Sequence, residues 1–189
     1  MKNRKLKIVF NSPTVLAFVF ISFAAMMIGY LTAGLTDRLL FTTYRSSLKD
    51  PFTYIRFFTH VLGHAGWEHY IGNMAYILLL GPLLEEKYGS KKILEIIAIT
   101  ALITGVINYL LFSNVALCGA SGIVFAFILL TSFTGFRDGE LPITFILVAV
   151  IFLGQQICEG LFVKDNVSNL SHVLGGVIGA IAGYQLNKK

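Results

Sequence analysis

The chain has 189 residues, of which 56% are hydrophobic and only 13% are charged, and its mean hydropathy is +0.74. An average soluble domain carries about 25% charged residues. The composition therefore argues against a water-soluble enzyme, a disordered tail and a nucleic-acid-binding protein, despite the net charge of +5. It indicates an all-α integral membrane protein.

Six apolar runs approach the length of about 20 residues that a membrane-spanning helix needs. They cover residues 13–35, 67–84, 92–112, 119–136, 142–162 and 169–186. The first run follows a basic N-terminal segment, as in a signal peptide, but it is longer than the roughly 7–15 residues of a signal-peptide core. We therefore predict six retained transmembrane helices that form a single membrane domain over residues 1–189.

The basic residues predict the orientation of the spans, because Lys and Arg concentrate in cytoplasmic loops. If the N-terminus is inside, ten of the fifteen basic residues fall on the inner side. They are Lys2, Arg4, Lys5, Lys7, Lys87, Lys91, Lys92, Arg137, Lys188 and Lys189. We therefore predict that both termini are cytoplasmic.

The loop between the first two spans, residues 36–66, is long and lies on the outer side in this topology. Its segment 51–60, PFTYIRFFTH, is too aromatic for a free aqueous loop. One interpretation is an amphipathic stretch at the membrane interface with aromatic anchors. The other is a partly inserted element beside a functional site.

Polar side chains gather where three of the predicted helices begin on the outer side. His69 and Asn73 are spaced i, i+4 and share one helix face. Ser121 begins the fourth helix, and His172 lies in the first turns of the sixth. Ionisable residues within membrane spans are costly and usually functional. The shared depth of these four residues therefore predicts a site below the outer surface.

Ser121 is flanked by Gly119 and Gly122, which allow close approach of a partner or a substrate. The N–H groups at a helix start are unpaired and lie at the positive end of the dipole. They are placed to receive an oxyanion. The alternative is that Ser121 only caps its helix.

His172 begins a stripe of small residues, because Gly175, Gly176, Gly179 and Gly183 follow on the same helix face. Such a stripe allows close helix packing and is by itself only a packing seam. If the partner is the fourth helix, His172 reaches Ser121 and serves as its general base. His69 and Asn73 then donate to the oxyanion.

A convincing acidic partner for His172 is missing from the sequence. Asp165 and Glu159 are near His172 in the chain, but they look like solvated loop charges. Any catalytic unit is therefore expected to be a Ser–His dyad.

Two segments match a known sequence pattern. Residues 119–122, Gly-Ala-Ser-Gly, follow a G-x-S-G nucleophile motif, and His172 with Gly175 and Gly179 follows A-H-x-x-G-x-x-x-G. Together they resemble the rhomboid family of intramembrane serine proteases.

The resemblance extends over nearly the whole chain. The pattern H-x-x-x-H-x-x-x-x-H-x-x-x-N is made by His60, His64, His69 and Asn73. Arg56 matches the basic residue of the family's W-R element, and Glu85 with Gly89 matches E-x-x-x-G after the second helix. Four elements in order, on the expected segments, make this resemblance specific.

The resemblance implies a minimal six-helix rhomboid core in a bacterial plasma membrane, with the active site facing the extracytoplasmic side and without a metal or cofactor. It implies hydrolysis of peptide bonds in or near the transmembrane segments of membrane-protein substrates. Ser121 is then the nucleophile and His172 the general base and acid. His69, Asn73 and the Ser121 N–H form the oxyanion hole, and the fifth helix is a mobile wall for lateral substrate access.

Three positions depart from the family pattern. Phe125 stands where many bacterial members have a tyrosine under the histidine, Ser171 replaces an alanine, and Tyr54 replaces the tryptophan of W-R. The aromatic packing of Phe125 is expected to persist without the hydroxyl's hydrogen bond.

Three other functions compete with this interpretation. A channel or transporter would need a polar track through the spans, but the polar residues cluster near one face. A metal site would use His60, His64 and His69, although the chain lacks H-E-x-x-H. The third alternative is an inactive rhomboid-like protein that binds membrane proteins.

Overall fold

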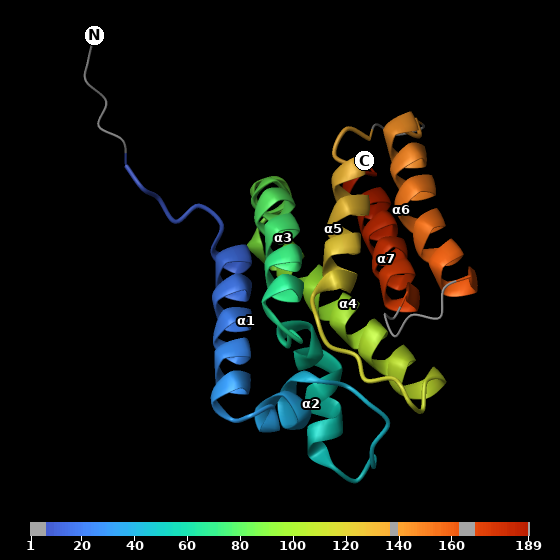
Figure 1. Ribbon diagram of the computed structural model, residues 1–189. Coiled ribbons are helices and arrows are strands. Elements are labelled where there is room, and N and C mark those ends of the chain that lie inside the picture. The colour runs from blue at the N-terminus through green and yellow to red at the C-terminus, as the bar shows by residue number, and fades with distance from the viewer. Residues whose placement is uncertain (1–6, 137–139, 163–168, 189) are drawn as a thin grey trace.

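The computed structural model describes residues 7–136, 140–162 and 169–188, with the backbone only for residues 159–162. Within this part of the chain the structure is helical and contains no strand beyond one isolated bridge. The elements in order are α1 (Pro13–Leu31), η1 (Asp37–Phe41), α2 (Pro51–Thr59), η2 (His60–Leu62), α3 (Trp67–Tyr88), α4 (Ser90–Leu111), α5 (Ser121–Ser132), α6 (Ile143–Phe162) and α7 (Asn169–Asn187) (Figure 1). A helix lies at each of the six predicted ranges, and η1, α2 and η2 occupy the predicted outer loop.

Two of these helices, α1 and α4, are long and apolar enough to cross a membrane by length and composition. The helix α5 and the apolar part of α6, Ile143–Cys158, are shorter. The structure therefore shows an all-helical fold, and the crossing of the bilayer by all six predicted helices stays a prediction.

The predicted span 119–136 is too long, because α5 has only 12 residues. Gly119 has φ +117 and stands outside the helix, and tight turns begin at Phe133. Twelve residues rise about 18 Å, compared with a hydrocarbon core of about 30 Å. The first predicted span, 13–35, is also too long, because α1 ends at Leu31, just before the left-handed residues Ala33 and Gly34.

Glu85, near the end of α3, caps the start of α1. Its carboxylate accepts hydrogen bonds from the N–H groups of Thr14 (2.9 Å) and Val15 (3.0 Å) and from the hydroxyl of Ser90 (2.6 Å). The N–H groups of a first helical turn have no partner within the helix and favour a nearby anion. Gly89, with φ +83, then turns the chain from α3 into α4.

Arg56 of α2 is 1% exposed and connects separate parts of the outer loop. Its guanidinium donates to the carbonyl of Leu39 (3.2 Å) and the hydroxyl of Ser46 (2.8 Å), and it pairs with Asp50 (3.1 Å). The ring of Tyr44 lies 4.6 Å from the guanidinium carbon. These partners compensate the buried charge and fix the position of α2.

The helix α2 turns an apolar face outward. Thr53 and Phe57 are buried, but the large side chains on the other face are exposed. They are Phe52, Tyr54, Ile55 and Phe58. Such a face suits a bilayer or its interface better than water.

The helices α5 and α7 are in backbone contact along the glycine stripe. A β-carbon on Gly175 would lie 2.0 Å from the carbonyl oxygen of Gly122, and one on Gly179 would lie 2.0 Å from that of Ala126. Only glycine allows this approach. The partner of Gly175 and Gly179 is therefore α5, whereas a β-carbon on Gly176 would meet Leu153 of α6 at 2.4 Å.

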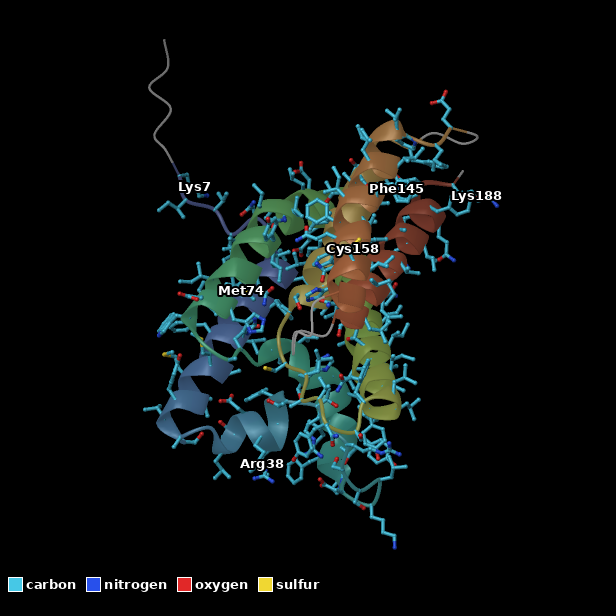
Figure 2. The ribbon with its side chains drawn as sticks, turned by 45° about the vertical axis from the view of Figure 1, so that its right-hand side comes forward. Lys7, Arg38, Met74, Phe145, Cys158 and Lys188 are labelled. Carbon is cyan, nitrogen blue, oxygen red and sulfur yellow. The ribbon has the colours of Figure 1, made fainter. Side chains whose placement is uncertain are left out.

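The two ends of the described chain lie on one side of the molecule, and α2 lies on the opposite side (Figure 1). Lys7 and Lys188 accordingly lie at one end and Arg38 at the other (Figure 2). The two ends of the described chain therefore lie on the same side of the fold, as they must if both face the same compartment.

Candidate functional site

Ser121 and His172 form the centre of the candidate site. The Oγ of Ser121 lies 2.8 Å from Nε2 of His172. Ser121 is the first residue of α5, and His172 lies in the first turn of α7. The close packing of Gly175 on Gly122 brings these two helix starts together. The pair therefore has the distance at which an imidazole accepts a hydroxyl proton.

The His172 ring is held from two further directions. Phe125, one turn along α5, stacks on it with ring centroids 4.6 Å apart and an interplanar angle of 4°. The Oε1 of Gln156 on α6 lies 2.5 Å from Nδ1 of His172, and the Gln156 side chain is buried. The face, the Nδ1 edge and the Nε2 edge of the imidazole thus each have a defined neighbour.

Sequence reasoning missed Gln156. A polar residue inside the apolar run 142–162 was an available signal, but the prediction considered only the helix starts on the outer side. Asp165 and the side chain of Glu159, which were considered as acidic partners, lie outside the described residues.

His69 and Asn73 lie beside the loop that precedes Ser121. A β-carbon on Gly119 would come within 2.5 Å of the His69 ring and 3.6 Å of the Asn73 Nδ2. Asn73 is buried, and its Nδ2 has no hydrogen-bond acceptor among the described residues. Both side chains from α3 therefore meet the glycine that leads into the nucleophile position, and one of them is an unused donor.

His60, the first residue of η2 after α2, is hydrogen-bonded to the same loop. Its carbonyl accepts from the N–H of Gly119 at 2.9 Å, its Nδ1 contacts the carbonyl of Arg56 at 3.1 Å, and its Nε2 contacts Thr104 Oγ1 at 3.3 Å. Burial lowers the pKa of His60 to about 4. His60 is therefore a neutral bridge between α2, α4 and the Ser121 loop.

His64 lies on the chain between η2 and α3. Its Nδ1 faces the carbonyl of Leu62 at 3.2 Å, and its ring packs edge-on against those of His69 (5.1 Å between centroids) and Tyr70 (5.4 Å). Burial first, and then the charge of a protonated His69, lowers its pKa to about 4. Among the described residues, no group of three or more His, Cys, Asp or Glu is arranged to hold a metal ion.

Three other predicted positions lie apart from the Ser121–His172 pair. Arg56 has its partners in the outer loop, and Glu85 and Gly89 shape the junction of α1, α3 and α4.

Cys118 precedes Gly119 and is a free thiol whose pKa is raised, mainly by burial. Cys158 is also free, and its side chain is exposed.

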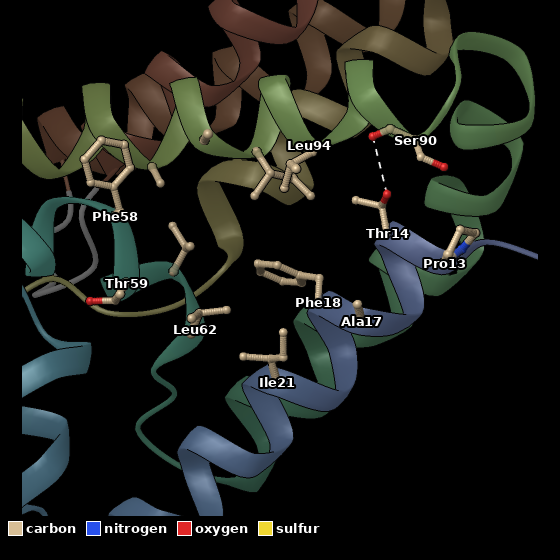
Figure 3. A pocket seen from close by; sticks show the side chains of 14 residues that line it. Pro13, Thr14, Ala17, Phe18, Ile21, Phe58, Thr59, Leu62, Ser90 and Leu94 are labelled. Carbon is tan, nitrogen blue, oxygen red and sulfur yellow. Dashed lines mark hydrogen bonds between the residues drawn. The ribbon is translucent and has the colours of Figure 1, made fainter.

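A cavity of about 590 Å³ lies between α1, the α2–η2 segment and α4 (Figure 3). Its walls are mostly apolar and include Phe18, Ile21, Leu62 and Leu94. Neither Ser121 nor His172 lines it, and none of its lining residues is ionisable. This cavity is therefore separate from the candidate site.

Comparisons with known proteins identify the family of this chain. Residues 51–189 match the family model of the Rhomboid domain, so the chain belongs to the rhomboid family. It is 24% identical over 159 residues to a protein of Haemophilus influenzae named rhomboid protease GlpG, with 80% of each chain covered. It is 30% identical over 126 residues to the proteins of the same name from Salmonella newport and Salmonella heidelberg. Those alignments cover 66% of this chain but only 45% of the Salmonella proteins.

Proposed function

We propose that this protein is an intramembrane serine endopeptidase that uses Ser121 and His172 as a catalytic dyad. The observation that carries the proposal is the 2.8 Å contact between Ser121 Oγ and His172 Nε2 at the starts of two packed helices. Membership of the rhomboid family and similarity to proteins named rhomboid proteases support it.

The first half of the reaction forms an acyl-enzyme. Ser121 Oγ attacks the carbonyl carbon of the scissile peptide bond while His172 Nε2 takes the hydroxyl proton. The tetrahedral intermediate collapses, the C–N bond breaks, and the imidazolium gives its proton to the leaving amine. In the second half, His172 takes a proton from water, the hydroxide attacks the ester, and Ser121 regains its proton as the acid product leaves.

The oxyanion is proposed to lie between the α5 N-terminus and α3. The Ser121 N–H belongs to the unpaired first turn of α5. Asn73 Nδ2 is a buried donor without an acceptor among the described residues, and His69 lies against Gly119. Donors that are already in position stabilise the developing charge without reorganisation.

The proposed substrates are membrane proteins, because the protein itself is proposed to lie within a bilayer. The apolar composition and the outward apolar face of α2 support a protein embedded in a lipid bilayer. We propose six spans in one domain, with both termini in the cytoplasm and the site open to the extracytoplasmic side of a bacterial plasma membrane. The substrates are then membrane proteins cleaved in or near a transmembrane segment.

The decisive test uses the purified chain in liposomes with a single-span model substrate. We expect cleavage by the wild type, and a loss of at least about 10³-fold in Ser121→Ala and His172→Ala. Ser132→Ala is the matched control, because the Ser132 hydroxyl on the same helix donates to the Leu129 carbonyl at 2.6 Å. A fluorophosphonate should label Ser121 in the wild type and in the control.

The alternative functions give different results in the same preparation. Substrate binding without cleavage or labelling would favour an inactive rhomboid-like binding protein. Solute flux without cleavage would favour a channel or transporter. Loss of cleavage on treatment with a chelator, without fluorophosphonate labelling, would favour a metal site.

A further inference from the structure

The ring of His172 is hydrogen-bonded to a residue of α6 that lies outside the proposed dyad and oxyanion hole. Gln156 is 7% exposed, and its Oε1 lies 2.5 Å from His172 Nδ1. The opposite nitrogen, Nε2, lies 2.8 Å from Ser121 Oγ. The two ring nitrogens therefore have different partners from different helices.

These partners select one tautomer of the imidazole. An amide oxygen only accepts hydrogen bonds, so Nδ1 carries the proton when it faces Oε1. Neutral Nε2 then has its lone pair toward Ser121 Oγ, as a general base requires. The opposite tautomer would place an N–H against the serine hydroxyl and leave no base for its proton.

Phe125 alone does not make this selection. Its stacking fixes the plane of the imidazole, because the rings are nearly parallel. A half-turn of the imidazole about χ2 keeps nearly the same plane but moves both nitrogens to the positions of ring carbons. A directional acceptor at Nδ1 opposes that rotation, whereas a flat apolar ring does not.

We propose that Gln156 is a positioning residue that holds His172 in the Nδ1–H tautomer with Nε2 directed at Ser121. This inference rests on the proposed protease function. Gln156 thereby fixes the tautomer and the orientation of the imidazole, as the buried carboxylate does in a Ser–His–Asp triad, but without the negative charge that stabilises the imidazolium. Because it belongs to α6, it also makes the geometry of the dyad depend on how α6 packs against α7.

The test compares two substitutions of similar size. Gln156→Leu removes the acceptor and fills the same space, and we expect kcat to fall about 10- to 100-fold with little change in KM. Gln156→Glu keeps an acceptor, so kcat should recover toward that of the wild type. A carboxylate also favours the protonated imidazole, so the acidic limb of the kcat/KM profile should move to higher pH. Thr144→Val, a polar-to-apolar change at an exposed position nearer the start of α6, is the matched control.

The rate of fluorophosphonate labelling separates this inference from the function on which it rests. If the wild type neither labels nor cleaves, the proposed function and the role of Gln156 are both wrong. If the wild type labels and Gln156→Leu labels equally fast with an unchanged pH profile, only the role of Gln156 is wrong. If Gln156→Leu does not fold, as judged by its unfolding midpoint, the pH shift of Gln156→Glu decides, and its absence overturns the inference.

Discussion

Gly175 of α7 lies against the backbone of Gly122 of α5, so that a β-carbon on Gly175 would fall 2.0 Å from the Gly122 carbonyl oxygen and 3.0 Å from its Cα. Gly122 follows Ser121, and Gly175 lies three residues after His172. The distance between the two helix backbones therefore determines whether the serine and the histidine meet.

Gly175→Ala is expected to separate α7 from α5. The added methyl group meets backbone rather than a flexible side chain, so we expect a loss of at least about 2 kcal/mol in stability and a large fall in cleavage. Thermal unfolding in detergent and a cleavage assay measure both effects. Gly72→Ala is the control, because a β-carbon there meets no heavy atom within 4 Å other than those of its chain neighbours and the nearby backbone of its own helix. Equal behaviour of the two variants would contradict the packing argument.

Asn73→Ala is expected to slow the chemical step. If its buried Nδ2 donates to the oxyanion, kcat should fall about 10²- to 10³-fold while KM changes little. Asn187→Ala removes an amide that contacts the Tyr88 hydroxyl at 2.8 Å near the end of α7, and it should leave kcat unchanged. An Asn73→Ala variant that folds normally and keeps the wild-type kcat would remove Asn73 from the oxyanion hole.

The stability of the protein should decrease in acid because of His60 and His64. An unfolded histidine binds a proton below about pH 6.5, whereas the folded pKa of each is lowered to about 4. The unfolded state therefore binds more protons between these values. The stabilisation is fully present above about pH 6.5, falls as the pH drops toward 4, and is worth up to ~3 kcal/mol for His60.

The unfolding midpoint, followed by circular dichroism across this window, measures the effect. His60→Gln should give a shallower pH dependence than the wild type, whatever its stability at neutral pH. The same slope in both proteins would show that His60 does not carry the effect.

Glu85→Ala is expected to destabilise the start of α1. The carboxylate satisfies the N–H groups of Thr14 and Val15, and the loss of such a cap costs about 1–2 kcal/mol. Glu86→Ala removes an exposed neighbouring carboxylate and should change the unfolding midpoint little. A larger effect of Glu86→Ala than of Glu85→Ala would be inconsistent with the capping role.

The positions of the helices along the chain, and several candidate site residues, could be predicted from the sequence. Apolar runs of helical length mark all six predicted ranges, because a segment surrounded by lipid must be apolar and must satisfy its own backbone hydrogen bonds. The glycine spacing after His172 predicted a close helix contact, and the polar helix starts pointed to Ser121, His172, His69 and Asn73. These inferences depend on local patterns that a single segment carries.

Local sequence patterns did not predict the ends of α5 or the proposed role of Gln156. The fourth apolar run continues past Ser132, and only the turns at Phe133 and the backbone angle of Gly119 make α5 a 12-residue helix. Gln156 is one polar residue in an apolar run, and nothing in that run indicates that its partner is His172, 16 residues along the chain.

The sequence by itself determined that the protein belongs in a membrane and where its helices lie. Composition and the spacing of apolar residues are properties of each segment alone. The tertiary structure alone decided which groups meet. Three contacts join different elements: Gly175 packs against Gly122, Gly119 packs against His69, and Gln156 is hydrogen-bonded to His172. Their distances follow from the packing of whole helices, and a misplacement of about 1 Å can lower a reaction rate about 10²-fold.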